Sequence, residues 1–121
     1  MRVVLVALAG AAGALCRYGI GLAVGERSFP WSTLAINVVG SFLLGLLLTM
    51  AASREWSPQV TTPIAVGFLG AFTTFSTFAW EGVSLGRADR LYLAAGYIAL
   101  SVSLGIGAAV VGVRVGQTLQ G

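Results

Sequence analysis

The sequence predicts an all-α membrane protein with four transmembrane helices, the third of them broken near its middle. The first observation is composition: of 121 residues, 57% are hydrophobic and 9% are charged, against about 45–50% and about 25% in soluble domains. A chain this short cannot hide so much apolar surface from water by folding alone. The second observation is a set of four long apolar stretches, and the third is a polar cluster inside one of them. We treat residues 1–121 as a single transmembrane domain.

The four apolar stretches cover approximately residues 3–24, 31–52, 60–85 and 91–115. Each is at least as long as the ~20 residues that a helix needs to cross the hydrocarbon core. Pro30 and Pro58 stand just before the second and third stretches, where a proline's missing N–H costs little. Trp31 and Tyr92 lie at the ends of stretches, as interfacial aromatic residues do. The linkers are short, so the helices follow an up-down-up-down path.

All seven basic residues are arginines, and they are scattered singly. One side of the membrane carries Arg2, Arg54 and Arg114, and the other carries Arg27, Arg87 and Arg90, with Arg17 near the end of the first helix. The positive-inside rule orients a membrane protein by an asymmetry that is almost missing here. The split predicts insertion both ways up, which makes an antiparallel dual-topology homodimer possible. Because the arginines form no patch, we expect the lipid bilayer, and not nucleic acid, as a partner.

The residue counts also exclude several classes of function. The chain has no histidine, one cysteine and four acidic residues. Histidine is the commonest general base and metal ligand, and a single cysteine forms no intrachain disulfide. With no paired carboxylates and no exposed domain, the sequence does not predict an enzyme.

Polar residues inside the apolar stretches are the candidate functional residues, because polar groups are expensive at membrane depth. Asn37 lies about two turns into the second stretch, and Thr33 shares its helical face. An asparagine amide offers two N–H donors and one acceptor. Asn37 therefore either contacts an anion or polar solute, or forms an interhelical hydrogen bond that holds a dimer together.

The third stretch is the most informative, because its centre at residues 67–78 reads GFLGAFTTFSTF. Four hydroxyl residues alternate there with phenylalanines whose spacings place the rings on one helical face. Gly67 and Gly70 loosen the helix just before, and hydroxyls can bond back to the backbone. We therefore predict a broken helix, whose freed carbonyls need partners in protein, water or a cation.

The phenylalanines of this segment are expected to divide into two pairs. For Phe68 and Phe72 we expect core or lipid contact. Phe75 and Phe78 are interleaved with the hydroxyl residues, which favours a place beside a polar pathway.

Four further polar residues have mainly structural interpretations. Glu81 is expected to pair with Arg17 or with an arginine of the third loop, and Arg17 is taken as a structural charge. Tyr97 and Ser101 are four residues apart and share a face of the fourth helix. Hydrogen bonding between helices is the simplest role for this last pair.

Residues 13–18 (GALCRY), 33–42 (TLAINVVGSF) and 67–78 together resemble segments of the Fluc (CrcB) family of fluoride channels. The third segment is highly specific, whereas the first alone is weak. The length and the four-helix layout match along the whole chain. The resemblance implies an antiparallel homodimer with two fluoride pathways and one central sodium ion.

The resemblance also implies roles for individual residues. Backbone carbonyls of Gly70 and Thr73 would hold the sodium ion, each contributed twice. Gly105 departs from the family pattern, because a hydroxyl there would extend the polar track beyond Ser101. The residues implied to line the fluoride pathway are Asn37, Phe75, Phe78, Thr33, Tyr97 and Ser101.

The predicted function is passive, fluoride-selective efflux across the cell (inner) membrane of a bacterium. A pore must replace the water of this small anion with donors, which an amide, hydroxyls and the positive edges of aromatic rings can supply. One alternative is a small multidrug-type proton-coupled transporter, which would want a carboxylate deep in the first helix, where this chain has none. Another is a non-transporting membrane subunit, which would not require the polar centre of the third stretch.

Overall fold

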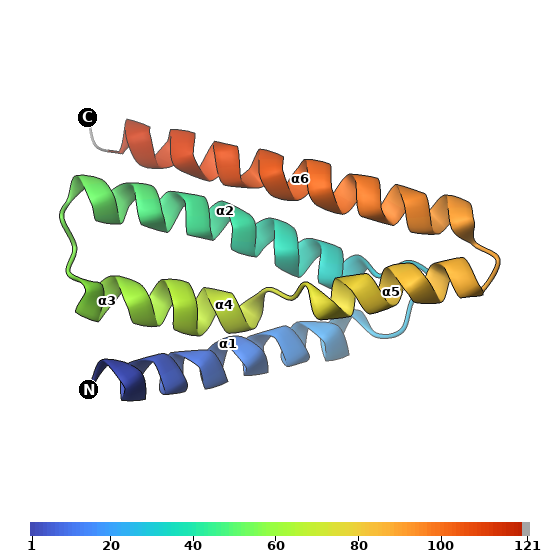
Figure 1. Ribbon diagram of the computed structural model, residues 1–121, viewed down its shortest axis with the longest axis horizontal. Helices are drawn as coiled ribbons and strands as arrows, with labels where there is room; N and C mark the ends of the chain where they lie inside the picture. The colour runs from blue at the N-terminus through green and yellow to red at the C-terminus, as the bar shows by residue number, and fades with distance from the viewer. Residues whose placement is uncertain (120–121) are drawn as a thin grey trace.

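The computed structural model describes residues 1–119, which form helices joined by short links (Figure 1). In this part of the chain, four spans are long and apolar enough to cross a membrane. Three are the continuous helices α1 (Arg2–Val24), α2 (Trp31–Ser53) and α6 (Leu91–Thr118). The other is built from α3 (Pro58–Thr62), the π-helical segment η1 (Pro63–Leu69), α4 (Gly70–Phe72) and α5 (Ser76–Arg87). The predicted all-α architecture with four spans is confirmed.

The ends of the later spans differ by a few residues from those expected. The third span begins at Pro58 rather than near residue 60, and it ends at Arg87 rather than at 85. Pro58 occupies the first helical position, where its fixed φ suits the helix. α6 continues past the expected end at 115 to Thr118. The apolar pattern stops earlier than the helix because polar residues such as glutamine also form helix well.

A widened turn inside the third span was not expected from the sequence. η1 starts at Pro63, and the Gly70 backbone N–H that closes it donates to the carbonyls of Ala65 and Gly67. Proline removes one helical hydrogen bond, and the wider turn follows it directly. π-Helical turns of this kind are rare and occur mostly at functional sites.

The third span breaks at residues 73–75, close to its middle. α4 ends at Phe72, Thr73 takes an extended conformation with φ −81° and ψ 158°, and α5 resumes at Ser76. In Figure 1 the break is the thin stretch between α4 and α5. The predicted broken third helix is confirmed, because the regular helical conformation is interrupted between Phe72 and Ser76.

The break also separates the phenylalanines into two pairs. Phe68 and Phe72 stack before the break, with ring centroids 5.8 Å apart, and Phe72 is buried. Phe75 and Phe78 lie after it, 5.9 Å apart and tilted. The rings therefore do not share the single helical face that their spacing predicts, because the helix is not continuous between them.

The spans pack in close pairs. α2 packs along α6, α1 lies along η1 and α4, and α5 packs on α6. At the α2–α6 contact, a Cβ on Gly112 would overlap the Phe42 carbonyl, and a Cβ on Gly45 would overlap the Ala109 carbonyl. Gly13 brings α1 equally close to the backbone of η1. Small residues at such points let helix backbones approach closely, as helix packing in membranes requires.

Few side chains are shielded by this packing. The main apolar cluster consists of Leu34, Leu85, Ala94 and Tyr97. Large apolar side chains elsewhere, such as Leu8 and Leu22 of α1, remain exposed. Lipid hydrocarbon is the solvent that suits such a surface, and the chain is a multi-pass membrane protein.

The start of α1, the end of α6 and the link between α2 and α3 lie at one end of the bundle (Figure 1). The other two links lie at the opposite end, as the predicted up-down-up-down path requires. Arginines therefore occur at both ends: Arg2, Arg54 and Arg114 toward the first, and Arg27, Arg87 and Arg90 toward the second.

Candidate functional site

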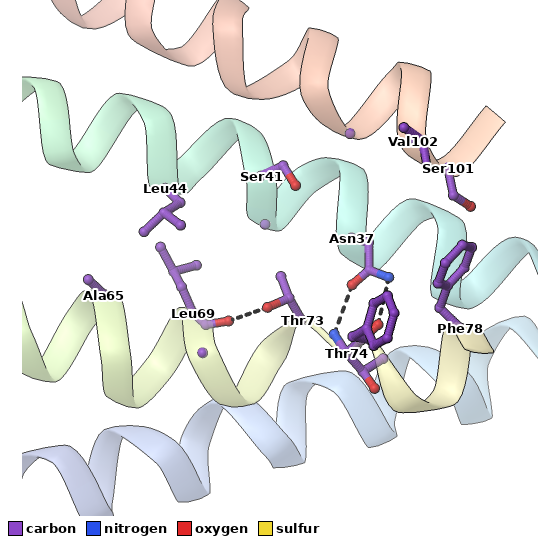
Figure 2. A pocket seen from close by; sticks show the side chains of 14 residues that line it. Asn37, Ser41, Leu44, Ala65, Leu69, Thr73, Thr74, Phe78, Ser101 and Val102 are labelled. Carbon is purple, nitrogen blue, oxygen red and sulfur yellow. Dashed lines mark hydrogen bonds between the residues drawn. The ribbon is translucent and has the colours of Figure 1, made fainter. Parts of the chain in front are cut away.

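Asn37 of α2 closes the break in the third span (Figure 2). Its Nδ2 donates to the Thr74 carbonyl oxygen at 2.9 Å, and its Oδ1 accepts from the Thr74 backbone N–H at 2.8 Å. One side chain thus satisfies both polar backbone groups of a residue outside any helix, as a low-dielectric environment demands. Both bonds join α2 to the break within one chain, and neither is the dimer-holding bond between helices that was one of the two interpretations of Asn37. The amide keeps a second Nδ2–H that Thr74 does not use.

Two hydroxyls cap the broken ends. Thr73 Oγ1 donates to the Leu69 carbonyl at 2.8 Å, at the end of α4 (Figure 2). Thr74 Oγ1 accepts from the Thr77 backbone N–H at 3.2 Å, in the first turn of α5. The hydroxyl cluster of the third stretch therefore bonds back to the backbone, as the sequence predicted.

The carbonyls of Gly70 and Thr73 are left without a helical partner. In a continuous helix they would accept from the N–H groups of Thr74 and Thr77. Both donors are taken, the first by Asn37 and the second by the Thr74 hydroxyl. Among the hydrogen bonds of the described residues, none ends on these two carbonyl oxygens. They are acceptors that the break has freed.

A cavity of about 350 Å³ lies beside the break (Figure 2). One face of α2, one face of α6 and the two sides of the break line it. All 14 lining residues are uncharged. Its polar and ring-bearing residues are Asn37, Ser41, Thr73, Thr74, Phe75, Phe78 and Ser101. The cavity therefore offers neutral hydrogen-bonding groups in an otherwise apolar wall.

The two rings at the cavity differ in their surroundings. Phe78 packs against Tyr97 with centroids 5.2 Å apart, so its position is fixed by α6. Phe75 is 79% exposed, although it lies at the middle of the span. Within this single chain, Phe75 forms an open edge of the cavity.

Ser101 places a buried hydroxyl at the cavity wall. Its Oγ has no hydrogen-bond partner in the part of the chain that the structure describes. A buried hydroxyl without a hydrogen bond costs free energy, which a hydrogen-bonding ligand would recover. The position at a cavity gives that hydroxyl access to a ligand.

Thr33 and Tyr97, which were also expected on the pathway, do not line this cavity. Thr33 is buried and faces a second pocket of about 350 Å³. Thr74 lines both pockets, so the Asn37 contact lies between them. Tyr97 is fully buried, and its Oη donates to Glu81 Oε1 at 3.0 Å. Tyr97 reaches the cavity only through the Phe78 ring.

The expected pairing of Arg17 with Glu81 is corrected by the structure. Arg17 Nε donates to the Ala71 carbonyl at 3.1 Å, whereas Glu81 accepts from Tyr97. Both residues line the second pocket. The break explains the difference, because it leaves the Ala71 carbonyl without a helical donor and Arg17 supplies one.

Two polar residues of the cavity were not among the predicted site residues. Thr74 carries the backbone contact to Asn37, and Ser41 adds a hydroxyl one turn from Asn37 on α2. The spacing of four residues between Asn37 and Ser41 was the signal for the second. Nothing in the sequence distinguishes Thr74 from the neighbouring hydroxyl residues, because its role depends on where the helix breaks.

Known proteins resemble this chain along nearly its whole length. The family described as "CrcB-like protein, Camphor Resistance (CrcB)" matches residues 4–113. A protein of Acidobacterium capsulatum named fluoride-specific ion channel FluC is 43% identical over 123 residues, covering 98% of each chain. Proteins with the same name from Thermus thermophilus and Idiomarina loihiensis are 42% and 46% identical, covering 99% and 85% of this chain and 98% and 82% of their own.

These matches extend over all four spans and over the break that shapes the cavity. They also agree with the resemblance carried by residues 13–18, 33–42 and 67–78. These relatives are named as ion channels and not as enzymes, in agreement with the expectation from the residue counts. The chain belongs to the CrcB family of membrane proteins.

Proposed function

We propose that this chain is a fluoride-selective channel that lets fluoride leave the cytoplasm passively and so lowers its concentration there. The observation that carries the proposal is the uncharged cavity beside the broken helix, lined by an amide, hydroxyls and two rings. Relatives that match this chain over nearly their full length are named fluoride-specific ion channels. The named relatives are bacterial, which supports placement in a bacterial inner membrane.

The chemistry of the cavity suits a small anion. Among the described residues, the second Nδ2–H of Asn37 and the hydroxyl of Ser101 are donors without another partner. The edges of Phe75 and Phe78 carry partial positive charge. The positive end of α5, which begins at Ser76, adds to this potential. No arginine or other charged side chain lies in the lining, so the anion is held weakly enough to leave, as conduction requires.

The two alternative functions are less well supported. A proton-coupled multidrug transporter needs a carboxylate that faces its substrate. Here Glu81 accepts a hydrogen bond from Tyr97 and lies outside the cavity lining. A non-transporting subunit would have no need for a polar cavity at the middle of a span.

Fluoride efflux from liposomes tests the proposal directly. The purified protein is reconstituted into liposomes loaded with potassium fluoride or potassium chloride, and efflux is started with valinomycin. We expect fluoride efflux far above protein-free liposomes and almost no chloride efflux. Absence of fluoride efflux, or equal chloride efflux, would contradict the proposal.

We also propose that the working unit is an antiparallel homodimer of chains inserted in both orientations. The near-equal division of arginines between the two ends supports dual insertion. The exposed Phe75 ring supports a second copy over the open edge of the cavity. Reporter fusions at the C-terminus should give signal from both sides of the membrane, and light scattering in detergent should give twice the mass of one chain. Signal from one side only, or a monomeric mass, would refute this arrangement.

Sodium at the dimer centre is a further part of the proposal. The carbonyl oxygens of Gly70 and Thr73 are free of helical partners and are ligands of the kind that hard cations prefer. These residues would hold the ion, which would raise the local positive potential. Purification and assay with N-methylglucamine in place of sodium should lower both fluoride efflux and the melting temperature. The melting temperature should not respond to an exchange of potassium for N-methylglucamine. Equal efflux and equal melting temperature with and without sodium would exclude the ion.

A further inference from the structure

The α6 wall of the cavity has a hydroxyl group at Ser101 but none at Gly105, one helical turn further on. Ser101 and Gly105 both line the cavity and are four residues apart, so they lie one above the other on the same helical face. Gly105 has no side chain to offer. A ligand that leaves the unpartnered Ser101 hydroxyl toward Gly105 therefore meets no donor from α6.

Ser41 brings a hydroxyl to this place from the facing helix. Its Oγ lies 3.8 Å from the position that a Cβ on residue 105 would take. Ser41 also lines the cavity and stands one turn from Asn37 on α2 (Figure 2). Among the hydrogen bonds of the described residues, none uses the Ser41 hydroxyl. This hydroxyl is free to bind a ligand.

The position of Ser41 is fixed by the contact next to it. A Cβ on Gly40 would overlap the Thr73 methyl group, so α2 sits tightly against the end of α4 at this level. The same contact places Ser41 at the cavity wall. A Cβ added at Gly105, by contrast, would have room: beyond the backbone of α6 itself, it would meet only the Ser41 hydroxyl within 4 Å, at ordinary contact distance.

We infer that Ser41 is a fluoride-binding residue that supplies, from α2, the hydroxyl that α6 lacks at Gly105. The inference rests on the proposed fluoride conduction. A strongly hydrated anion must keep donors around it along its whole path, because each step without one raises the barrier. Ser41 receives the anion from Asn37 and Ser101 and continues the row of donors past Gly105.

The experiment compares fluoride efflux from liposomes for matched variants. Ser41→Ala removes only the hydroxyl and should lower efflux by about tenfold, the value of one hydrogen bond to a charged group. Ser103→Ala is the control, because Ser103 lies on α6 outside the cavity lining. The double variant Ser41→Ala/Gly105→Ser returns the hydroxyl to the same place from α6 and should restore most of the efflux. Ser41→Ala/Gly105→Ala adds the Cβ without the oxygen and should stay low.

The outcomes separate this inference from the function on which it rests. If the wild-type protein releases no fluoride, the channel itself is refuted. If the wild type releases fluoride and Ser41→Ala releases it equally fast, only the role of Ser41 is refuted. The same holds if Gly105→Ser and Gly105→Ala restore efflux equally in the Ser41→Ala background. Size-exclusion chromatography in detergent checks that each variant folds. Should Ser41→Ala not fold, Ser41→Cys takes its place, because a thiol is a weak donor of similar size.

Discussion

The side chain of Asn37 and the backbone of Thr74 form two hydrogen bonds, at 2.9 and 2.8 Å, across the space between α2 and the break. The pattern is that of two paired residues in an antiparallel sheet, which exchange both backbone bonds. Here a single amide side chain supplies the donor and the acceptor. Asn37 is therefore a cavity residue whose orientation is set by the break that it closes.

Asn37→Ala should lower both stability and efflux. The substitution leaves the Thr74 N–H and C=O without partners, and each unsatisfied group costs about 1–3 kcal/mol. We expect a loss of at least about 2 kcal/mol in the free energy of unfolding, measured by denaturant titration in detergent. Ser103→Ala, which removes an exposed hydroxyl on α6, should change it by less than about 0.5 kcal/mol. Equal stability of the two variants would show that the contact is not needed to hold the break.

Phe75→Ile and Phe78→Ile should both reduce fluoride efflux, because isoleucine has no positive ring edge. Phe78→Ile should lose more stability than Phe75→Ile, by about 0.5–1.5 kcal/mol, since the Phe78 ring packs against Tyr97 as well as against Phe75. Phe68→Ile is the control, because Phe68 lies outside the cavity lining. Efflux assays and thermal melts on the three variants give the comparison. An equal loss of efflux for Phe68→Ile would show that the Phe75 and Phe78 rings have no specific role in the pathway.

Gly13→Ala should destabilise the protein, because the added Cβ would overlap the Phe68 carbonyl where α1 meets η1. Overpacking of this kind costs about 1–3 kcal/mol. Gly19→Ala lies on the same helix with nothing within 4 Å of its Cβ position. It should be neutral or stabilising by up to about 1 kcal/mol, because alanine favours helix. Melting temperatures in detergent test the pair, and a reversed order would contradict the close approach of α1 and η1.

Tyr97→Phe should destabilise the packing of α5 on α6. The buried hydroxyl donates to Glu81, and its loss leaves a carboxylate without that donor, at a cost of about 1.5–3 kcal/mol. Tyr92→Phe removes a hydroxyl from an exposed tyrosine of the same helix and should change little, within about 0.5 kcal/mol. Denaturant titration of both variants is the measurement. Similar effects at the two positions would argue against the Tyr97–Glu81 bond.

The spans and the break could be predicted from the sequence, because both depend on local patterns. Apolar length locates a span, and a run of hydroxyl residues after Gly67 and Gly70 marks a weak helix. The widened turn at Pro63 could not be predicted, since proline also occurs in kinks and at helix starts. The ends at Arg87 and Thr118 lie beyond the apolar pattern that defined the spans.

The site was predicted in part for the same reason. Asn37 and Ser101 were placed on helical faces that do meet at the cavity. Thr33 and Tyr97 were placed on those faces too, but they lie beyond the contact of Asn37 with the break. Which side of that contact a residue occupies depends on the relative shift of the helices along their axes, and no periodicity within one helix reports that shift.

The hydrogen bonds that close the break all run within one chain, from Asn37, Arg17 and the hydroxyls of Thr73 and Thr74. The break can therefore close in a single copy, before any contact with a second one. In the antiparallel homodimer proposed above, association would then join two preformed surfaces, with little ordering left to complete. A defect at Asn37 would accordingly stay with the copy that carries it, so each half of a mixed pair would keep its own stability.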